Sequence, residues 1–251
     1  MSMNLKELEQ SKLRDEAEII AEWKKGPEEP AVSISCCAFN HEAYIETALQ
    51  GFLMQETNFP FEILIHDDAS TDGTAAIIRA DHERYPLIIK PILQVENQYS
   101  KGNKPGRINH KRALGKFIAV CEGDDCWTDA SKLQRQVDAL LDHPEIDLCF
   151  HSATKVDYSK GQSKTLIGRY ANTSQAVIPM ESIVLRPHGL IPTASVLIRR
   201  ELFEDIRKFR ETRKYLAVGD IYLFFFGAMR GGALYIDRNM SLYRSKLPDS
   251  W

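Results

Sequence analysis

Three carboxylates lie within four residues at Glu122, Asp124 and Asp125, directly after the apolar segment 118–121. Burying unpaired carboxylates is costly, so a buried strand that runs into them should leave the core at an edge or crevice. Carboxylate oxygens suit a hard cation, and Mg²⁺ sites commonly combine one or two carboxylates with substrate phosphates. The pattern predicts a divalent-cation site, with an acidic turn whose Asp129 caps the next helix as the alternative.

A second acidic run, 67–74, follows the apolar segment 61–66. The carboxylates of Asp67 and Asp68 could accept hydrogen bonds from a base or a ribose, and Asp68 is the better candidate. The alternative is a turn that only starts the following helix, which would account for the end of the run. The run also opens like an EF-hand calcium loop, but its twelfth position is Arg79 instead of the bidentate Glu, which excludes that site.

A single acid, Asp220, stands ahead of the apolar segment 221–227. Apolar surroundings raise the pKa of a carboxylate by desolvation and make it a usable proton acceptor. The alternative is a simple helix N-cap, a role for which Asp is well suited.

Strands alternate with helices around these acids. The expected strands are 32–39, 61–66, 87–93, 118–121 and 147–153, and the expected helices are 40–54, 74–84 and 131–142. This alternation predicts a largely parallel sheet, in which ligands bind at the carboxyl ends of the strands. The remainder is less regular, with a polar region at 154–176, a strand at 194–198, a helix at 219–230 and a hairpin-like end at 233–243.

Two further segments have no place in this alternation. Residues 1–30 carry apolar positions at helical spacing and end in a linker, and we expect this helix to pack on its own domain. Dimer contact and docking on a partner are the alternatives. Residues 96–110 are polar and aperiodic, and a loop of that length in a compact domain is typical of a functional lid.

The composition of the 251 residues is that of an ordinary globular protein, with 43% hydrophobic and 27% charged residues. A formal net charge of −3 provides no basic field for nucleic acid, so we expect no such partner. No apolar run approaches the length that spans a bilayer. Five cysteines without a C-x-x-C pair favour neither a disulfide framework nor a zinc ribbon, which predicts a cytoplasmic location.

The segments 32–40, 67–74 and 122–127 together resemble the inverting family 2 glycosyltransferases, over roughly residues 31–244. The resemblance implies the GT-A fold, an α/β fold with one Rossmann-like domain. This fold has a mostly parallel mixed sheet flanked by helices, here with an N-terminal helix. Residues 1–30 would form a helical extension and linker. Residues 31–251 would form the glycosyltransferase domain, with a nucleotide-sugar half at about 31–125 and an acceptor half at about 126–251.

The resemblance also implies roles for the nucleotide-sugar half. Backbone and side chains at Cys37, Ala38 and Phe39 would flank the nucleotide base, and Asp68 would hydrogen-bond it. Asp124 would contact the ribose and a divalent cation, Mn²⁺ or Mg²⁺. Asp125 would be a second metal-side carboxylate, and Glu122 stands where the family usually has the first Asp of its DXD motif.

For the acceptor half, the resemblance makes Asp220 the general base and places Pro192, Thr193 and Ser195 beside the acceptor. The donor would be a nucleotide sugar, most simply a UDP-sugar, and the acceptor a glycan or lipid-linked glycan of bacterial surface polysaccharide. Peripheral association with the inner face of the membrane and homo-oligomer formation stay open. The alternatives in function are a catalytically inactive nucleotide-sugar-binding partner and a nucleotidyltransferase.

The departures of this chain from the family pattern include Glu122 and the connection 107–115. Glu122 replaces the commoner Asp, which lengthens the reach of the carboxylate by one methylene. The connection 107–115 is shorter than usual, so we expect the helix found there in the family to be lost.

Overall fold

The computed structural model describes residues 2–185, 190–211 and 220–247. Within these residues, ten strands form one sheet, in the order β3-β2-β1-β4-β9-β6-β10-β5, with β7 paired to β6 and β8 paired to β10. The strands are β1 (Val32–Ala38), β2 (Phe61–Asp67), β3 (Ile89–Leu93), β4 (Phe117–Val120), β5 (Cys126–Trp127), β6 (Leu148–Asp157), β7 (Ser163–Ile167), β8 (Gln175–Ile178), β9 (Leu197–Arg199) and β10 (Ala233–Ser245).

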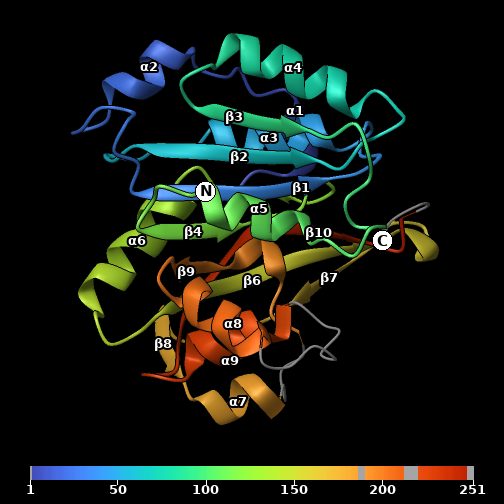
Figure 1. Cartoon of the computed structure of the whole chain (residues 1–251). Helices are drawn as coiled ribbons and strands as arrows, with labels where there is room; N and C mark the ends of the chain where they lie inside the picture. Colours follow the sequence, from blue (N-terminus) through green and yellow to red (C-terminus); the bar gives the residue numbers. More distant parts are fainter. Residues whose placement is uncertain (1, 186–189, 212–219, 248–251) are drawn as a thin grey trace.

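Helices cover both faces of this sheet, with α5 in front and α3 behind in Figure 1. The α-helices are α1 (Leu5–Glu9), α2 (Glu16–Ala21), α3 (Ile45–Leu53), α4 (Thr74–Arg84), α5 (Pro105–Arg112), α6 (Lys132–Asp142), α7 (Met180–Leu185), α8 (Leu202–Glu211) and α9 (Asp220–Ala228). Two 3₁₀ turns, η1 (Tyr158–Lys160) and η2 (Thr193–Ser195), complete the described elements. None of the described helices is long and apolar enough to cross a membrane.

The predicted alternation of strands and helices is confirmed in the first half of the chain. Strands β1 to β4 run parallel, with β1 between β2 and β4. In the second half, β9 pairs antiparallel with both β4 and β6, and so joins the two halves into one mixed sheet. The fold class expected from the sequence is therefore confirmed.

The predicted hairpin at 233–243 is wrong, because β10 is one strand of 13 residues. It runs parallel to β6 and antiparallel to β5 and β8. The polar residues 237–239, which suggest a turn in the sequence, coincide with register shifts against β6 between Ile236 and Asn239. A bulge of this kind bends a strand without ending it.

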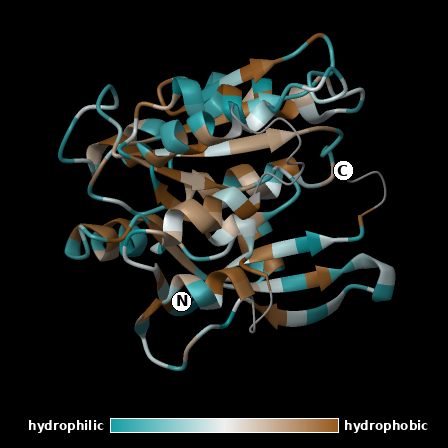
Figure 2. Ribbon diagram, turned by 60° about the horizontal axis from the view of Figure 1, so that its bottom comes forward, coloured by the Kyte–Doolittle hydropathy of each residue, from teal (hydrophilic) through white to brown (hydrophobic). Residues whose placement is uncertain are grey.

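The central strands are buried on both faces. Alternate residues of β1, including Val32 and Ile34, pack with α3 on one side. The intervening Ser33 and Ser35 are also buried, and the Ser33 hydroxyl donates to Glu62 Oε1 at 2.6 Å. Figure 2 shows hydrophobic residues along the strands of the sheet and hydrophilic residues in the connecting loops.

The N-terminal segment packs on its own domain, as expected, but forms two short helices instead of one. Asp15 is the N-cap of α2: its side chain accepts the backbone N–H of Glu18, and its own backbone N–H donates to the Glu18 side chain. This capping box starts a new helix, so the chain turns between α1 and α2. Leu8 and Ile19 are buried in the main core, and Trp23 meets the ring of Phe61 edge-on at 5.3 Å.

Residues 105–112 form helix α5, so the expectation of an irregular segment up to 110 and of a lost helix is wrong. Pro105 occupies the first turn, where its missing N–H costs nothing. Asn109 Nδ2 donates to the carbonyls of Cys36 and Leu64, and Arg112 donates to two further strand carbonyls. Polar contacts with the sheet therefore hold a helix that lacks an apolar stripe.

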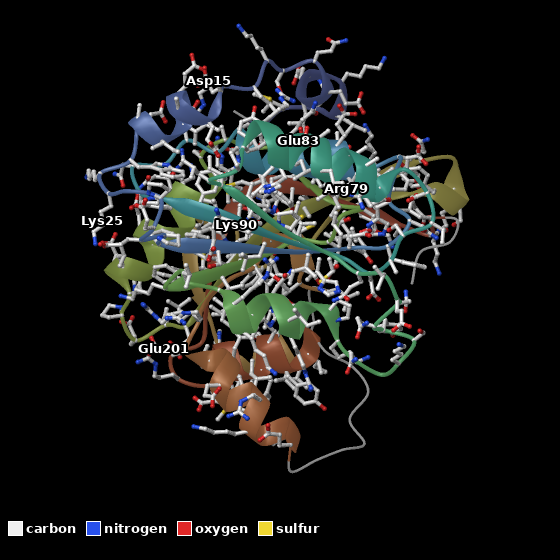
Figure 3. The ribbon with its side chains drawn as sticks, turned by 45° about the horizontal axis from the view of Figure 1, so that its top comes forward. Asp15, Lys25, Arg79, Glu83, Lys90 and Glu201 are labelled. Atoms are coloured by element: carbon white, nitrogen blue, oxygen red, sulfur yellow. The ribbon has the colours of Figure 1, made fainter. Side chains whose placement is uncertain are left out.

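Helix α4 shows the usual division between a buried and a solvated face. Ile78 is fully buried against the sheet, whereas the exposed Arg79 and Glu83 lie on the outer side of α4 in Figure 3. This helix packs against β3.

Candidate active site

The carboxyl ends of β1, β2 and β4 meet at one edge of the sheet. Ala38 pairs with Asp67 across β1 and β2, and Ser35 pairs with Val120 across β1 and β4. Backbone hydrogen bonds continue past the strands: the N–H of Asp68 donates to Ala38 O at 2.9 Å, and the N–H of Gly123 donates to Cys37 O at 2.8 Å. The structure thus brings Cys37, Asp68 and the acidic turn 122–125 together at one edge of the sheet.

The loops after β1 and β2 are tied to each other. Asn40, in the left-handed region with φ 54°, accepts the N–H of Thr71 on its side-chain oxygen and donates its own N–H to Ser70 Oγ, both at 2.9 Å. The N–H of His41 donates to Thr74 Oγ1 at 2.8 Å. The 70–74 run therefore braces the loop after β1, in addition to starting α4.

Within the acidic turn, the two aspartates differ in their surroundings. Asp124 is 8% exposed, whereas Asp125 is 2% exposed and its carboxylate accepts the backbone N–H of Arg244 at 2.8 Å. Burial raises the pKa of Asp125 well above its ordinary value, and the charge of Asp124 raises it further. The buried Asp125 side chain therefore stabilises the turn by bonding it to β10, and Asp124 is the more exposed of the two aspartates.

Arg244 on β10 is a component of the site that the sequence-based prediction missed. Its buried guanidinium donates to the main-chain oxygen of Asp124 at 2.6 Å and to Thr47 Oγ1 at 3.4 Å, and lies 5.1 Å from the centre of the Tyr44 ring. The available signal was an arginine at an alternating strand position that is otherwise apolar (Met240 and Leu242). This cation offsets part of the negative charge of the turn.

Asp68 is fully buried and holds the turn that follows β3. Its two oxygens accept the backbone N–H groups of Gln98 at 2.7 Å and Tyr99 at 3.0 Å, and His66 Nε2 lies 3.5 Å away. A ligand can therefore reach this carboxylate only when the 97–103 segment moves.

An open groove of about 1860 Å³ begins at this edge. Cys37 and Glu122 line one part of it, and residues of α5 and α8 line another part, where the tilted rings of His110 and Phe203 have centroids 3.9 Å apart. Ala38 is fully buried on the opposite side of β1 from Cys37. Phe39 is half-buried.

The residues predicted on the acceptor side lie at the same edge. Because β9 is antiparallel to β4, the turn before β9 meets the end of β4, where Val120 N–H donates to Val196 O at 3.2 Å. Pro192 is buried and Thr193 is half-buried. Ser195 is fully buried and its hydroxyl donates to Pro192 O at 2.6 Å, so this hydroxyl stabilises the turn.

Asp220 is the first residue of α9, but its side chain and the preceding residues 212–219 lie outside the described part of the structure. Among the described residues, no group of three or more His, Cys, Asp or Glu side chains is arranged to hold a metal ion. Glu122, Asp124 and Asp125 therefore do not converge as one ligand set. This donor set still fits a Mg²⁺-type site, in which one or two carboxylates act together with substrate phosphates.

An α/β sheet with an acidic turn at its carboxyl edge and a groove beside it has the organisation of a nucleotide-sugar transferase. A family model described as Glycosyl transferase family 2 matches residues 33–207, and the chain belongs to this family.

Relatives and solved structures agree with this assignment. The chain is 34% identical over 221 residues to an uncharacterized protein of Mycobacterium tuberculosis, covering 88% of this chain and 60% of that protein. It is 33% identical over 112 residues to the UDP-Glc:alpha-D-GlcNAc-diphosphoundecaprenol beta-1,3-glucosyltransferase WfgD of Escherichia coli, covering 44% of this chain and 41% of that protein. The chain thus spans about 60% of the length of the first of these relatives.

Two solved structures share the fold. The TarS 1–349 structure of S. aureus in complex with UDP-GlcNAc has a TM-score of 0.60 at 19% identity, covering 87% of this chain and 59% of that one. The mannosyltransferase PcManGT of Pyrobaculum calidifontis, in complex with GDP-Man and Mn²⁺, has a TM-score of 0.61 at 16% identity, covering 98% and 63%. Together with the family match, this likeness in fold confirms the predicted GT-A fold.

Proposed function

We propose that this chain transfers a sugar from a UDP-sugar to an acceptor hydroxyl with inversion, in a cation-dependent reaction. The observation that carries the proposal is the convergence of Cys37, Asp68 and Asp124 at the edge where three parallel strands end. The names of the E. coli relative and of the TarS complex include UDP-linked sugars, which supports the choice of nucleotide.

The nucleotide base would lie against the end of β1. Cys37 would contact it from the groove, whereas the buried Ala38 contributes its backbone, and Phe39 flanks the base. Asp68 would accept a base N–H. Its two oxygens accept the amide N–H groups of Gln98 and Tyr99, so a bond to the base would replace at least one of these two bonds. The 97–103 segment must shift first, which is why we propose it as the lid.

Asp124 would hold the divalent cation together with the donor diphosphate, and Glu122 would extend toward the same cation. When bound, Mn²⁺ or Mg²⁺ supplies a Lewis acid that stabilises the leaving nucleoside diphosphate. Asp125 would support the position of Asp124, because its carboxylate accepts the Arg244 N–H and so holds the turn against β10. The Mn²⁺ in the PcManGT complex supports a cation in this fold.

The acceptor would lie between Thr193 and Asp220. Asp220 removes the proton of the acceptor hydroxyl while its oxygen attacks the anomeric carbon, and the bond from that carbon to the diphosphate oxygen breaks on the opposite side. A single displacement of this kind inverts the anomeric configuration. Pro192 and Ser195 would shape the turn that presents Thr193. The name of the E. coli relative includes GlcNAc-diphosphoundecaprenol, which supports a glycan or lipid-linked glycan acceptor for this chain, and we place the reaction at the inner face of the membrane.

Calorimetry with UDP in Mn²⁺ and in EDTA tests the donor site. We expect binding only with the cation, and a large loss of affinity in Asp124→Ala. Tight binding in EDTA that is unaffected by Asp124→Ala would refute the proposed site. Release of UDP from UDP-sugars on addition of acceptor glycans, with NMR of the product's anomeric proton, tests the transfer and the inversion.

A further inference from the structure

A buried histidine, His41, lies against the acidic turn 122–125. His41 is 3% exposed, and neither of its ring nitrogens has a hydrogen-bond partner among the described residues. Nε2 lies 3.9 Å from Asp124 Oδ2, which is just beyond hydrogen-bond distance. Buried polar groups are nearly always hydrogen-bonded, so an imidazole in this state has an unused interaction directed toward Asp124.

The backbone fixes the place of this ring. The N–H of His41 is held by Thr74 Oγ1 at 2.8 Å, and its carbonyl accepts the N–H groups of Tyr44 and Ile45 at the start of α3. Gly123 lets the acidic turn approach the ring closely, since a Cβ at this position would lie 2.9 Å from Nδ1 and 3.0 Å from Ile45 Cδ1. The imidazole therefore has little freedom, and a small shift of the Asp124 side chain closes the gap.

We propose that His41 is a positioning residue for Asp124. Its Nε2–H donates to Asp124 Oδ2 when the carboxylate binds the cation, which leaves Oδ1 as the oxygen that binds the cation. A carboxylate ligand is oriented by hydrogen bonds from outside the metal's own shell, and loss of such a partner typically lowers metal affinity about 10–100-fold. This inference rests on the function proposed above.

The test is a titration of Mn²⁺ into protein with saturating UDP, read by calorimetry, for wild type, His41→Leu and His41→Gln. Leucine fills the buried site but cannot donate, so the Mn²⁺ concentration for half-maximal binding should rise about 10–100-fold. Glutamine can place an amide N–H near the position of Nε2, and should recover most of the affinity. A wild-type Mn²⁺ requirement in His41→Leu, or a glutamine variant as weak as the leucine variant, would overturn the proposal.

His151 provides a matched control. It is also fully buried with an unpartnered Nε2 among the described residues, but it lies on β6, where its Nδ1 contacts Ser152 O at 2.8 Å. His151→Leu should lower the melting temperature as His41→Leu does and leave the Mn²⁺ requirement unchanged; an equal rise in both would overturn the proposal. A wild type that binds UDP equally without Mn²⁺ would refute the proposed function itself. A cation-dependent wild type with an unchanged His41→Leu variant would refute only the positioning role.

Discussion

Lys132 at the start of α6 is fully buried, and replacing it tests how burial in the core changes the pKa of an amine. Its Nζ donates to Gln136 Oε1 at 2.7 Å and lies 4.0 Å from the centre of the Trp127 ring. Burial lowers the pKa of Lys132 from 10.5 to about 7, against the opposing effect of Cys121 and Cys149. His151 is the other nearby base, and burial lowers its pKa well below the ordinary value.

A lysine with a lowered pKa in the folded state makes stability rise with pH. Between the folded value of about 7 and the unfolded value of 10.5, the unfolded chain keeps a proton that the folded chain has released. The free energy of unfolding therefore increases with pH in this range, by at most about 1.4 kcal/mol per pH unit. Integrated from pH 6 to pH 9, the gain assigned to Lys132 is about 2–3 kcal/mol.

Urea denaturation at pH 6, 7, 8 and 9 measures this gain as the difference between wild type and Lys132→Met. Methionine keeps the apolar length and removes the amine, so the wild type should gain about 2–3 kcal/mol relative to the variant across this range. Exposed Lys164→Met is the control and should show no pH-dependent difference. A constant difference between wild type and Lys132→Met would mean that the Trp127 ring and Gln136 keep the ammonium charged, and would refute the reasoning.

Three further predictions concern the site. Asp220→Asn should lower turnover about 10²–10⁴-fold with unchanged UDP affinity, since a general base meets only the acceptor hydroxyl; an active variant with wild-type kcat would return Asp220 to a helix cap. Amide exchange of residues 97–103 should slow when UDP and Mn²⁺ bind, and equal exchange in both states would exclude a lid. Arg244→Met should lower the free energy of unfolding by about 3 kcal/mol in urea titrations, because it removes a buried cation beside Asp125; a loss below 1 kcal/mol would show that the charge is not needed.

The acidic edge was predictable because its signals are local. Apolar runs such as 61–66 followed at once by carboxylates identify strand ends, and parallel strands place their ends at one edge. The family resemblance then indicated the same positions, with Asp68 and Asp124 among them. The helices at 74–84 and 131–142 were also predicted, and α6 has a buried apolar face that includes Leu133, Val137 and Leu140.

The missed features depend on contacts between distant parts of the chain. Helix α5 has no apolar stripe, and what holds it is the donation from Asn109 and Arg112 to strand carbonyls far away in sequence. The bulge around Asp237 has the polar composition of a turn, so β10 resembled a hairpin. The partner of Asp125 is 119 residues away, and no pattern in the sequence links the two positions.

That separation has a consequence for the order of folding. Strands β1 to β4 are joined by short connections, whereas closing a loop of about 119 residues costs chain entropy of about 4 kcal/mol before the Arg244 contact can repay it. We expect Asp125 to be hydrated and ionised before β10 docks and desolvated afterwards. On this basis, the acidic turn should reach its final electrostatic state late in refolding. Recovery of UDP binding should lag behind recovery of the helical circular-dichroism signal, because non-local strand pairing is slow.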